Sequence, residues 1–238
     1  YFDIINDCYW KKALDIAGID IDKLPVAMPC GEPVGNILSN VAQELQLPES
    51  VMVVTGAMDQ VAAALGAGCI RDGIITETTG TALVMAAYTT SPCFEHPSRV
   101  TIYRHALQGS YLYLPIGNTA GMFLKWFRQN FCQEIPLTEP KAYALLDNMA
   151  ESIPAGCNGL ITLPYLAGCV NPDNNSSAKG VFFGADLGTT KAHFVRSIME
   201  AVCFMMRDFI NMLSELGVKP EVIYSLGGGS RSELWEQM

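Results

Sequence analysis

The sequence has few residues of the kinds that hold structural metals. It contains three histidines and eight cysteines, and no two cysteines have the Cys-x-x-Cys spacing. Zinc sites use clustered cysteine and histidine ligands, so a zinc site is not expected. We expect the cysteines to be buried free thiols in a reducing cytosol, which predicts a cytoplasmic protein.

Long apolar runs and a surplus of positive charge are missing as well. No stretch approaches the ~20 apolar residues of a membrane-spanning helix. Lysine and arginine number 15 against 24 acidic residues, a net charge of −9. This balance argues against nucleic acid or an anionic membrane as the main partner. A phosphate ligand stays open, because backbone amides at helix starts bind anions without basic side chains.

The composition that is present is that of a globular protein. Half of the 238 residues are hydrophobic and 16% are charged, so the chain can bury a sizeable core. Position 1 is tyrosine, and the chain stops at Met238 within SELWEQM, a helical pattern that has barely begun. We therefore expect the chain to be a piece of a larger protein.

Hydrophobic periodicity and turn residues predict an alternation of strands and helices. Helices are expected at 3–18, 37–45, 60–68, 121–131, about 140–152 and 191–216. Strands are expected at 51–55, on both sides of a Thr-Gly-Thr turn within 74–88, at 100–106 and 110–116, in GLITLPYLAG, and in VIYSL. The run Val51–Val54 and the strand in GLITLPYLAG should both be buried. This order predicts an α/β layered fold.

The longest predicted helix follows Thr190, which is expected to cap it, and ends before Gly217. Its apolar residues recur every three or four positions, so they indicate a core-facing stripe and not a ligand site. Arg196 and Glu200 are four residues apart, which predicts an ion pair on one helix face.

Asp59 stands between a β-branched run and a helical pattern, in VMVVTGAMDQ. One interpretation is a helix cap, with the carboxylate accepting a bond from a first-turn amide. The other is a general base at the carboxyl end of a strand, where α/β sheets bind their ligands. The local sequence leaves both interpretations open.

Two glycine-containing turns also carry two interpretations each. Thr78–Thr81 (Thr-Thr-Gly-Thr) is either a tight hairpin or a turn whose amides grip a phosphate. Gly227–Ser230 (Gly-Gly-Gly-Ser) is either a flexible connection or a loop that lets a nucleotide approach the backbone. It is neither a Walker A loop nor the Gly-x-Gly-x-x-Gly fingerprint. Together, the strand-end turns predict a nucleotide held by backbone amides and a metal.

The order of these motifs resembles the FGGY family of carbohydrate kinases, and within it most closely the xylulose kinases. The motifs are TGAMDQVAAALGAG, TTGTA, GLITLPYLAGCVNPDNNSSAKGVFFGADLGTTKAHFVRSIMEA and SLGGGSRSELWEQM. The resemblance implies an α/β fold of the ribonuclease-H-like, actin-like ATPase type, with two domains around a cleft. Residues 1–73 would then be the C-terminal remnant of the sugar-binding domain. Residues 74–238 would be the nucleotide-binding domain, truncated at its C-terminal end.

The resemblance also implies a role for particular residues. Asp59 falls on the catalytic base. The nucleotide side comprises Gly80 and Thr81 in the phosphate-binding turn, Gly121 and Lys125 beside the nucleotide pocket, and Gly228 and Gly229 against the adenosine. No metal ligand is implied within this chain, because the metal-binding aspartate of the family is expected upstream of Tyr1.

The implied activity is ATP- and Mg²⁺-dependent phosphorylation of a small, xylulose-like sugar or polyol, with Asp59 as general base. The alternative is an actin-like nucleotide-binding scaffold or switch without kinase activity. We expect a kinase in the full-length protein and an inactive chain when residues 1–238 stand alone. Sugar or polyol and ATP are the expected partners; oligomeric state is not readable, and a homodimer stays open.

Overall fold

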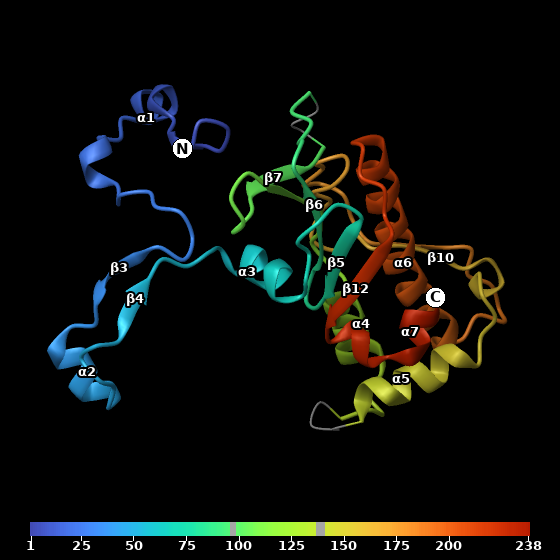
Figure 1. The fold of residues 1–238 in the computed structure, drawn as a ribbon. Helices are drawn as coiled ribbons and strands as arrows, with labels where there is room; N and C mark the ends of the chain where they lie inside the picture. Colours follow the sequence, from blue (N-terminus) through green and yellow to red (C-terminus); the bar gives the residue numbers. More distant parts are fainter. Residues whose placement is uncertain (96–98, 137–140) are drawn as a thin grey trace.

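The computed structural model describes residues 1–95, 99–136 and 141–238. A sheet with helices on both faces is built from residues 59–238, and residues 1–58 form short helices and hairpins to one side of it (Figure 1). The predicted α/β architecture is therefore confirmed. No helix in the described part of the chain is both long and apolar enough to cross a membrane.

The central sheet brings together strands from distant parts of the sequence. Its members are β5 (Ile74–Thr79), β6 (Leu83–Thr89), β7 (Thr101–Arg104), β8 (Tyr111–Leu114), β9 (Ile116–Gly117) and β12 (Val222–Gly227). The strand order is β12-β5-β6-β8-β7, with β9 paired to β6. β12 runs parallel to β5, and Gly227 pairs with Thr79, so both strands end at the same edge of the sheet. All the strands predicted between 74 and 116 and the VIYSL strand are confirmed.

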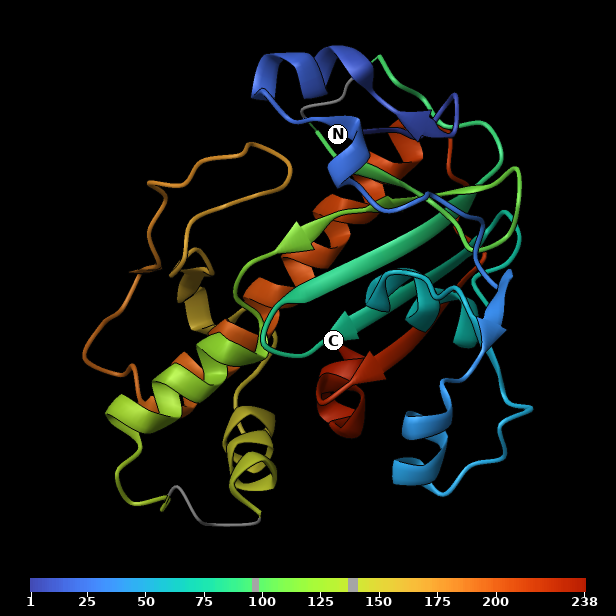
Figure 2. The ribbon, with the colours of Figure 1, turned by 90° about the vertical axis from the view of Figure 1, so that its left-hand side faces the viewer.

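Alternate residues of β5 point to opposite faces of the sheet, and both sets are apolar enough to pack against helices. Helices therefore cover both faces. Ile75 packs into one core with Val202 and Phe209 of α6 (Lys191–Glu215). Ile74 packs into another with Val61 of α3 (Asp59–Gly66). Figure 2 shows α3 in front of the sheet and α6 behind it.

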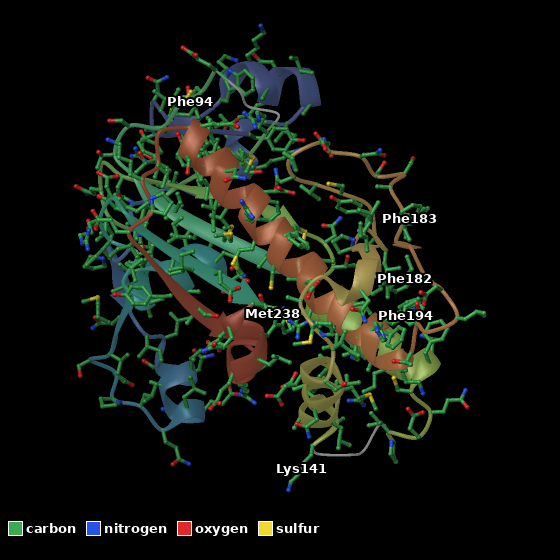
Figure 3. The ribbon with its side chains drawn as sticks, turned by 90° about the vertical axis from the view of Figure 1, so that its right-hand side faces the viewer. Phe94, Lys141, Phe182, Phe183, Phe194 and Met238 are labelled. Atoms are coloured by element: carbon green, nitrogen blue, oxygen red, sulfur yellow. The ribbon has the colours of Figure 1, made fainter. Side chains whose placement is uncertain are left out.

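A further core surrounds the first half of α6. It contains α4 (Gly121–Phe131) and α5 (Ala142–Glu151), both predicted, although position 140 lies outside the described residues. The ring of Phe194 lies 5.0 Å from that of Phe182, which is on β11 (Val181–Phe183). Figure 3 shows these two residues beside the exposed Phe183. Sequence neighbours on a strand thus lie on opposite faces.

Burial of the GLITLPYLAG strand was predicted and is wrong. Its strand, β10 (Ile161–Leu163), leaves Ile161 55% and Leu163 43% exposed. β10 pairs with β11 in a two-stranded sheet, and only the face carrying Thr162 is covered, by α6. The apolar residues alternate onto the uncovered face.

The first 58 residues contain β1 (Phe2–Asp3), β2 (Cys8–Tyr9), α1 (Lys11–Ala17), β3 (Pro33–Asn36), α2 (Ser39–Leu45) and β4 (Met52–Val54), with a 3₁₀ turn at Ile21–Lys23. The helix predicted from residue 3 is wrong for its first half. Asp3 Oδ1 accepts hydrogen bonds from the amides of Ile5 and Asn6, at 2.9 and 3.1 Å, and so makes a turn. The predicted stop is confirmed, because Gly18 ends α1 with φ 66°.

Burial of the run at 51–54 is also wrong. Met52, Val53 and Val54 are 50, 44 and 52% exposed. β4 pairs with β3 in a two-stranded sheet, and the described residues place no second layer over it.

The eight cysteines are free, but they are not all buried. Cys69, Cys132, Cys157 and Cys169 are buried as predicted. Cys8 and Cys30 are exposed, because they lie in the thinly packed first 58 residues.

The ends of α6 follow the prediction. Thr190 is the N-cap residue, and its amide donates to His193 Nδ1 over 3.2 Å. Gly217 follows the helix with φ 92°. The Arg196–Glu200 pair is confirmed, with Nε and Oε1 2.8 Å apart. The chain then passes through β12 and a 3₁₀ turn at Gly229–Arg231 to α7 (Glu233–Gln237).

Candidate active site

The turn between β5 and β6 receives the start of α4. The amide of Gly121 donates to Gly80 O over 2.9 Å, and those of Ala120 and Met122 donate to Thr81 O over 3.0 and 3.2 Å. The first amides of a helix have no partner inside it, so these bonds satisfy them and attach α4 to the turn. Two segments that the sequence analysis placed at a nucleotide site are thus in direct contact.

Glycine at position 121 has a packing reason. A Cβ atom there would lie 2.4 Å from Gly80 O, which is closer than real Cβ contacts come. Gly121 is therefore needed for the contact between α4 and the turn, whether or not a ligand binds. Lys125, one helical turn later, is exposed on α4.

The triple-glycine loop lies against Thr79, the residue before Gly80. Gly227 adopts φ 87°, in the left-handed region that favours glycine. A Cβ atom on Gly229 would lie 2.7 Å from the Thr79 side chain, so that position also needs glycine for packing. The Thr78–Thr81 turn therefore contacts both the α4 start and the triple-glycine loop.

Gly80 and Gly228 differ from the other glycines here. A Cβ atom on Gly80 would meet no described atom within 4 Å, and one on Gly228 would meet only Thr79 O, at 3.9 Å. Neither residue has a positive φ. Neither packing nor backbone conformation within the described chain therefore requires glycine at these positions. A phosphate or nucleoside can approach the backbone closely where no side chain is in the way. Gly80 and Gly228 therefore fit a nucleotide.

Asp59 is the first residue of α3, and the N-cap position belongs to Met58. Asp59 Oδ1 accepts a hydrogen bond from the Gln60 amide over 2.7 Å, and the side chain is exposed. Within the described residues, no hydrogen bond joins Asp59 to the glycine loops. The carboxylate supports the start of α3 as an acidic first-turn residue and stays accessible from outside.

Glu77 is a polar residue of this edge that the sequence analysis did not single out. It is only 4% exposed, and Thr79 Oγ1 donates to its Oε2 over 2.8 Å. The hydroxyl of Ser225 on β12 donates to Oε1. Burial raises the pKa of Glu77 above its usual range, and the two hydroxyls oppose that shift. An acid inside a predicted strand of otherwise neutral residues is the signal that could have identified Glu77.

A cavity of about 530 Å³ borders Glu77 between the sheet, α6 and α7. Thr79 and Gly229 also line it, so it reaches the two glycine loops. Arg207 and Glu236 are among the charged residues in its wall. The described residues gather no group of three side chains able to hold a metal ion.

Two family models match the chain. The C-terminal domain of the FGGY family of carbohydrate kinases matches residues 76–238, and the N-terminal domain of that family matches residues 1–66. The chain belongs to the FGGY family of carbohydrate kinases. The family resemblance inferred from the motifs is confirmed.

Curated relatives of this FGGY chain include two enzymes of Bacillus subtilis. Its xylulose kinase is 30% identical over 221 residues, which covers 93% of the chain and 43% of the relative. Its gluconokinase is 30% identical over 237 residues, covering 96% of the chain and 45% of the relative. The chain thus spans less than half the length of either relative.

Among solved structures, the FGGY chain is similar to the xylulose kinase of Rhodospirillum rubrum. The sequence identity is 29% and the TM-score 0.83, over 95% of the chain and 45% of that protein. The actin-like fold class predicted from the motifs is therefore confirmed.

Proposed function

We propose that this chain is part of a kinase that transfers the γ-phosphoryl group of ATP to a hydroxyl of a small, xylulose-like sugar or polyol. The observation that carries the proposal is the meeting of the Gly80 turn, the start of α4 and the triple-glycine loop at one edge of the sheet, in a chain of this family. The names of the relatives, xylulose kinase and gluconokinase, support a small polyhydroxylated substrate.

In this proposal the nucleotide is held mainly by backbone. Gly80 and Thr81 receive the phosphates, and Gly228 and Gly229 lie against the adenosine. Lys125 is exposed one turn along α4 from Gly121, and in this proposal its ammonium group contacts the phosphates. Mg²⁺ would neutralise phosphate charge during the transfer, as it generally does in phosphoryl transfer.

Asp59 is proposed to accept the proton of the attacking sugar hydroxyl. Its exposure supports this role, because a general base must reach a substrate that comes from outside the fold. We propose that residues 1–73 belong to the sugar side and residues 74–238 to the nucleotide side. α3, which carries Asp59, packs on the nucleotide-side sheet through Val61 and Ala64. This packing would fix the base relative to the phosphate turn.

The test is ADP release by the whole protein, meaning this chain with the additional length that its relatives have. ADP should be measured with ATP and Mg²⁺ across pentoses, ketopentoses, aldonates and polyols. We expect release well above the sugar-free background with at least one substrate of this panel, highest with a ketopentose. ATP binding without sugar-stimulated release across the panel would contradict the kinase and favour a nucleotide-binding scaffold.

A further inference from the structure

We propose that Glu77 is a positioning residue that ties the phosphate turn to the triple-glycine loop and so sets the shape of the nucleotide site. The inference rests on the proposed function, since it concerns how that site is built. Glu77 itself lies beneath the loops, not among the residues assigned to the ligand.

Each carboxyl oxygen of Glu77 is bonded to a different strand. Oε2 accepts from Thr79, the last residue of β5 before the Gly80 turn, over 2.8 Å. Oε1 accepts from Ser225 on β12, directly across from Glu77 and two residues before Gly227. One side chain therefore joins the two strands where both are about to leave the sheet.

The Thr79 side chain connects Glu77 to the triple-glycine loop. Its hydroxyl is held by Glu77, which fixes the rotamer and turns the rest of the side chain toward Gly229. The space beside Gly229 is filled by this side chain, at 2.7 Å from an ideal Cβ position. A different Thr79 rotamer would change the surface against which the triple-glycine loop rests.

Packing alone gives no reason for an acid at this position. Burying a carboxyl group costs free energy unless it is hydrogen-bonded, and an apolar residue would fill the strand without that cost. Tyr224, Cys203, Arg207 and Glu236 are the titratable or charged neighbours around the same cavity. Among the ion pairs of the described residues, none joins one of these neighbours to Glu77. We therefore assign the Glu77 carboxyl group the role of binding the hydroxyls of Thr79 and Ser225.

The experiment compares Glu77→Leu, Glu77→Gln and Thr79→Val in the whole protein. Leucine removes both hydrogen bonds at similar size. Glutamine keeps one acceptor oxygen, and its NH2 group can donate to the other hydroxyl. Valine replaces the Thr79 hydroxyl with a methyl group. Thr76→Val is the matched control, because Thr76 is equally buried on the opposite face of β5. Binding of a non-hydrolysable ATP analogue is measured by calorimetry, beside KM for ATP, KM for sugar and thermal unfolding.

We expect Glu77→Leu and Thr79→Val each to weaken analogue binding and raise KM for ATP by about 3- to 10-fold, the effect of one or two hydrogen bonds. The KM for sugar should change by less than about twofold. Glu77→Gln should weaken analogue binding much less than Glu77→Leu does. The double variant should lose less than the product of the two single losses, because both remove the same bond.

Unchanged analogue affinity in Glu77→Leu would overturn the inference, as would equal increases in the two KM values. If leucine prevents folding, Thr79→Val and Ser225→Ala remove the same bonds one at a time and carry the test. Failure of the proposed function is distinguishable, since it appears as absent sugar turnover in the unmutated protein. Analogue binding tests Glu77 regardless of turnover.

Discussion

Asp59 and Glu77 are both acidic, yet the structure gives them opposite surroundings. Asp59 is exposed at the start of α3 and makes one local hydrogen bond. Glu77 is buried, and its bonds reach a strand 148 residues away in the sequence. A carboxylate that contacts a substrate must be exposed, as Asp59 is. A carboxylate that connects two strands must be buried between them, as Glu77 is.

At this scale the first prediction concerns Asp59→Asn in the whole protein. We expect kcat to fall by about 10²–10⁴-fold, the usual contribution of a general base, with KM for ATP nearly unchanged. Asparagine keeps an oxygen for the Gln60 amide, so thermal unfolding should shift little. Steady-state kinetics and a melting curve on the same sample decide the matter. Normal kcat per folded molecule would assign Asp59 to helix stabilisation alone.

Sequence reasoning reached Asp59 but not Glu77, and the reason is physical. The position of Asp59 after a strand and before a helix is visible within residues 51–68. The role of Glu77 depends on Ser225, and that pairing exists only once β12 has been placed beside β5. Short-range patterns do not contain such a partner.

Among the structural elements, the β5–β6 turn allows two glycines to be compared. In Gly121→Ala the new methyl group would meet Gly80 O, and we expect the free energy of unfolding to fall by about 1–3 kcal/mol, as in overpacked cores. In Gly80→Ala the methyl group faces open space, so stability should be kept or raised by up to about 1 kcal/mol. ATP-analogue binding should nevertheless weaken in Gly80→Ala.

Urea unfolding and calorimetric titration of both variants check this contrast. Gly80→Ala with unchanged analogue affinity would show that the open space beside Gly80 is not used by the nucleotide. A stable Gly121→Ala protein would mean that the α4 start can move away from the turn at little cost.

Prediction from sequence succeeded for elements whose apolar residues are buried in the folded protein, as their hydrophobic periodicity implies. The apolar stripe on α6 is long and is buried along its whole length, in two neighbouring cores, so its period identified the helix. The prediction of burial failed for β4 and β10, because no layer of the described chain covers their apolar residues. The composition of a strand does not show what packs against it. At Asp3 the side chain competes with the helix for nearby amides, and the turn prevails.

For the molecule as a whole, we predict that residues 1–238 alone bind nucleotide weakly and do not phosphorylate sugar at ordinary kinase rates. The glycine loops are present, but the chain spans less than half the length of its curated relatives. Positioning of reactants can lower a barrier by about 7–11 kcal/mol, so a base without a positioned sugar should give almost no rate. Calorimetry with an ATP analogue beside a turnover assay tests both parts. Turnover at ordinary rates would refute this prediction.

The pairing of β12 with β5 also has a consequence for biosynthesis. Ser225 is made 148 residues after its partner Glu77, which at about 5–20 residues per second is roughly 7–30 s later. During that interval one edge of β5 has no neighbour and can pair with other chains. Occupation of this edge by a chaperone would protect the nascent protein until β12 has been made.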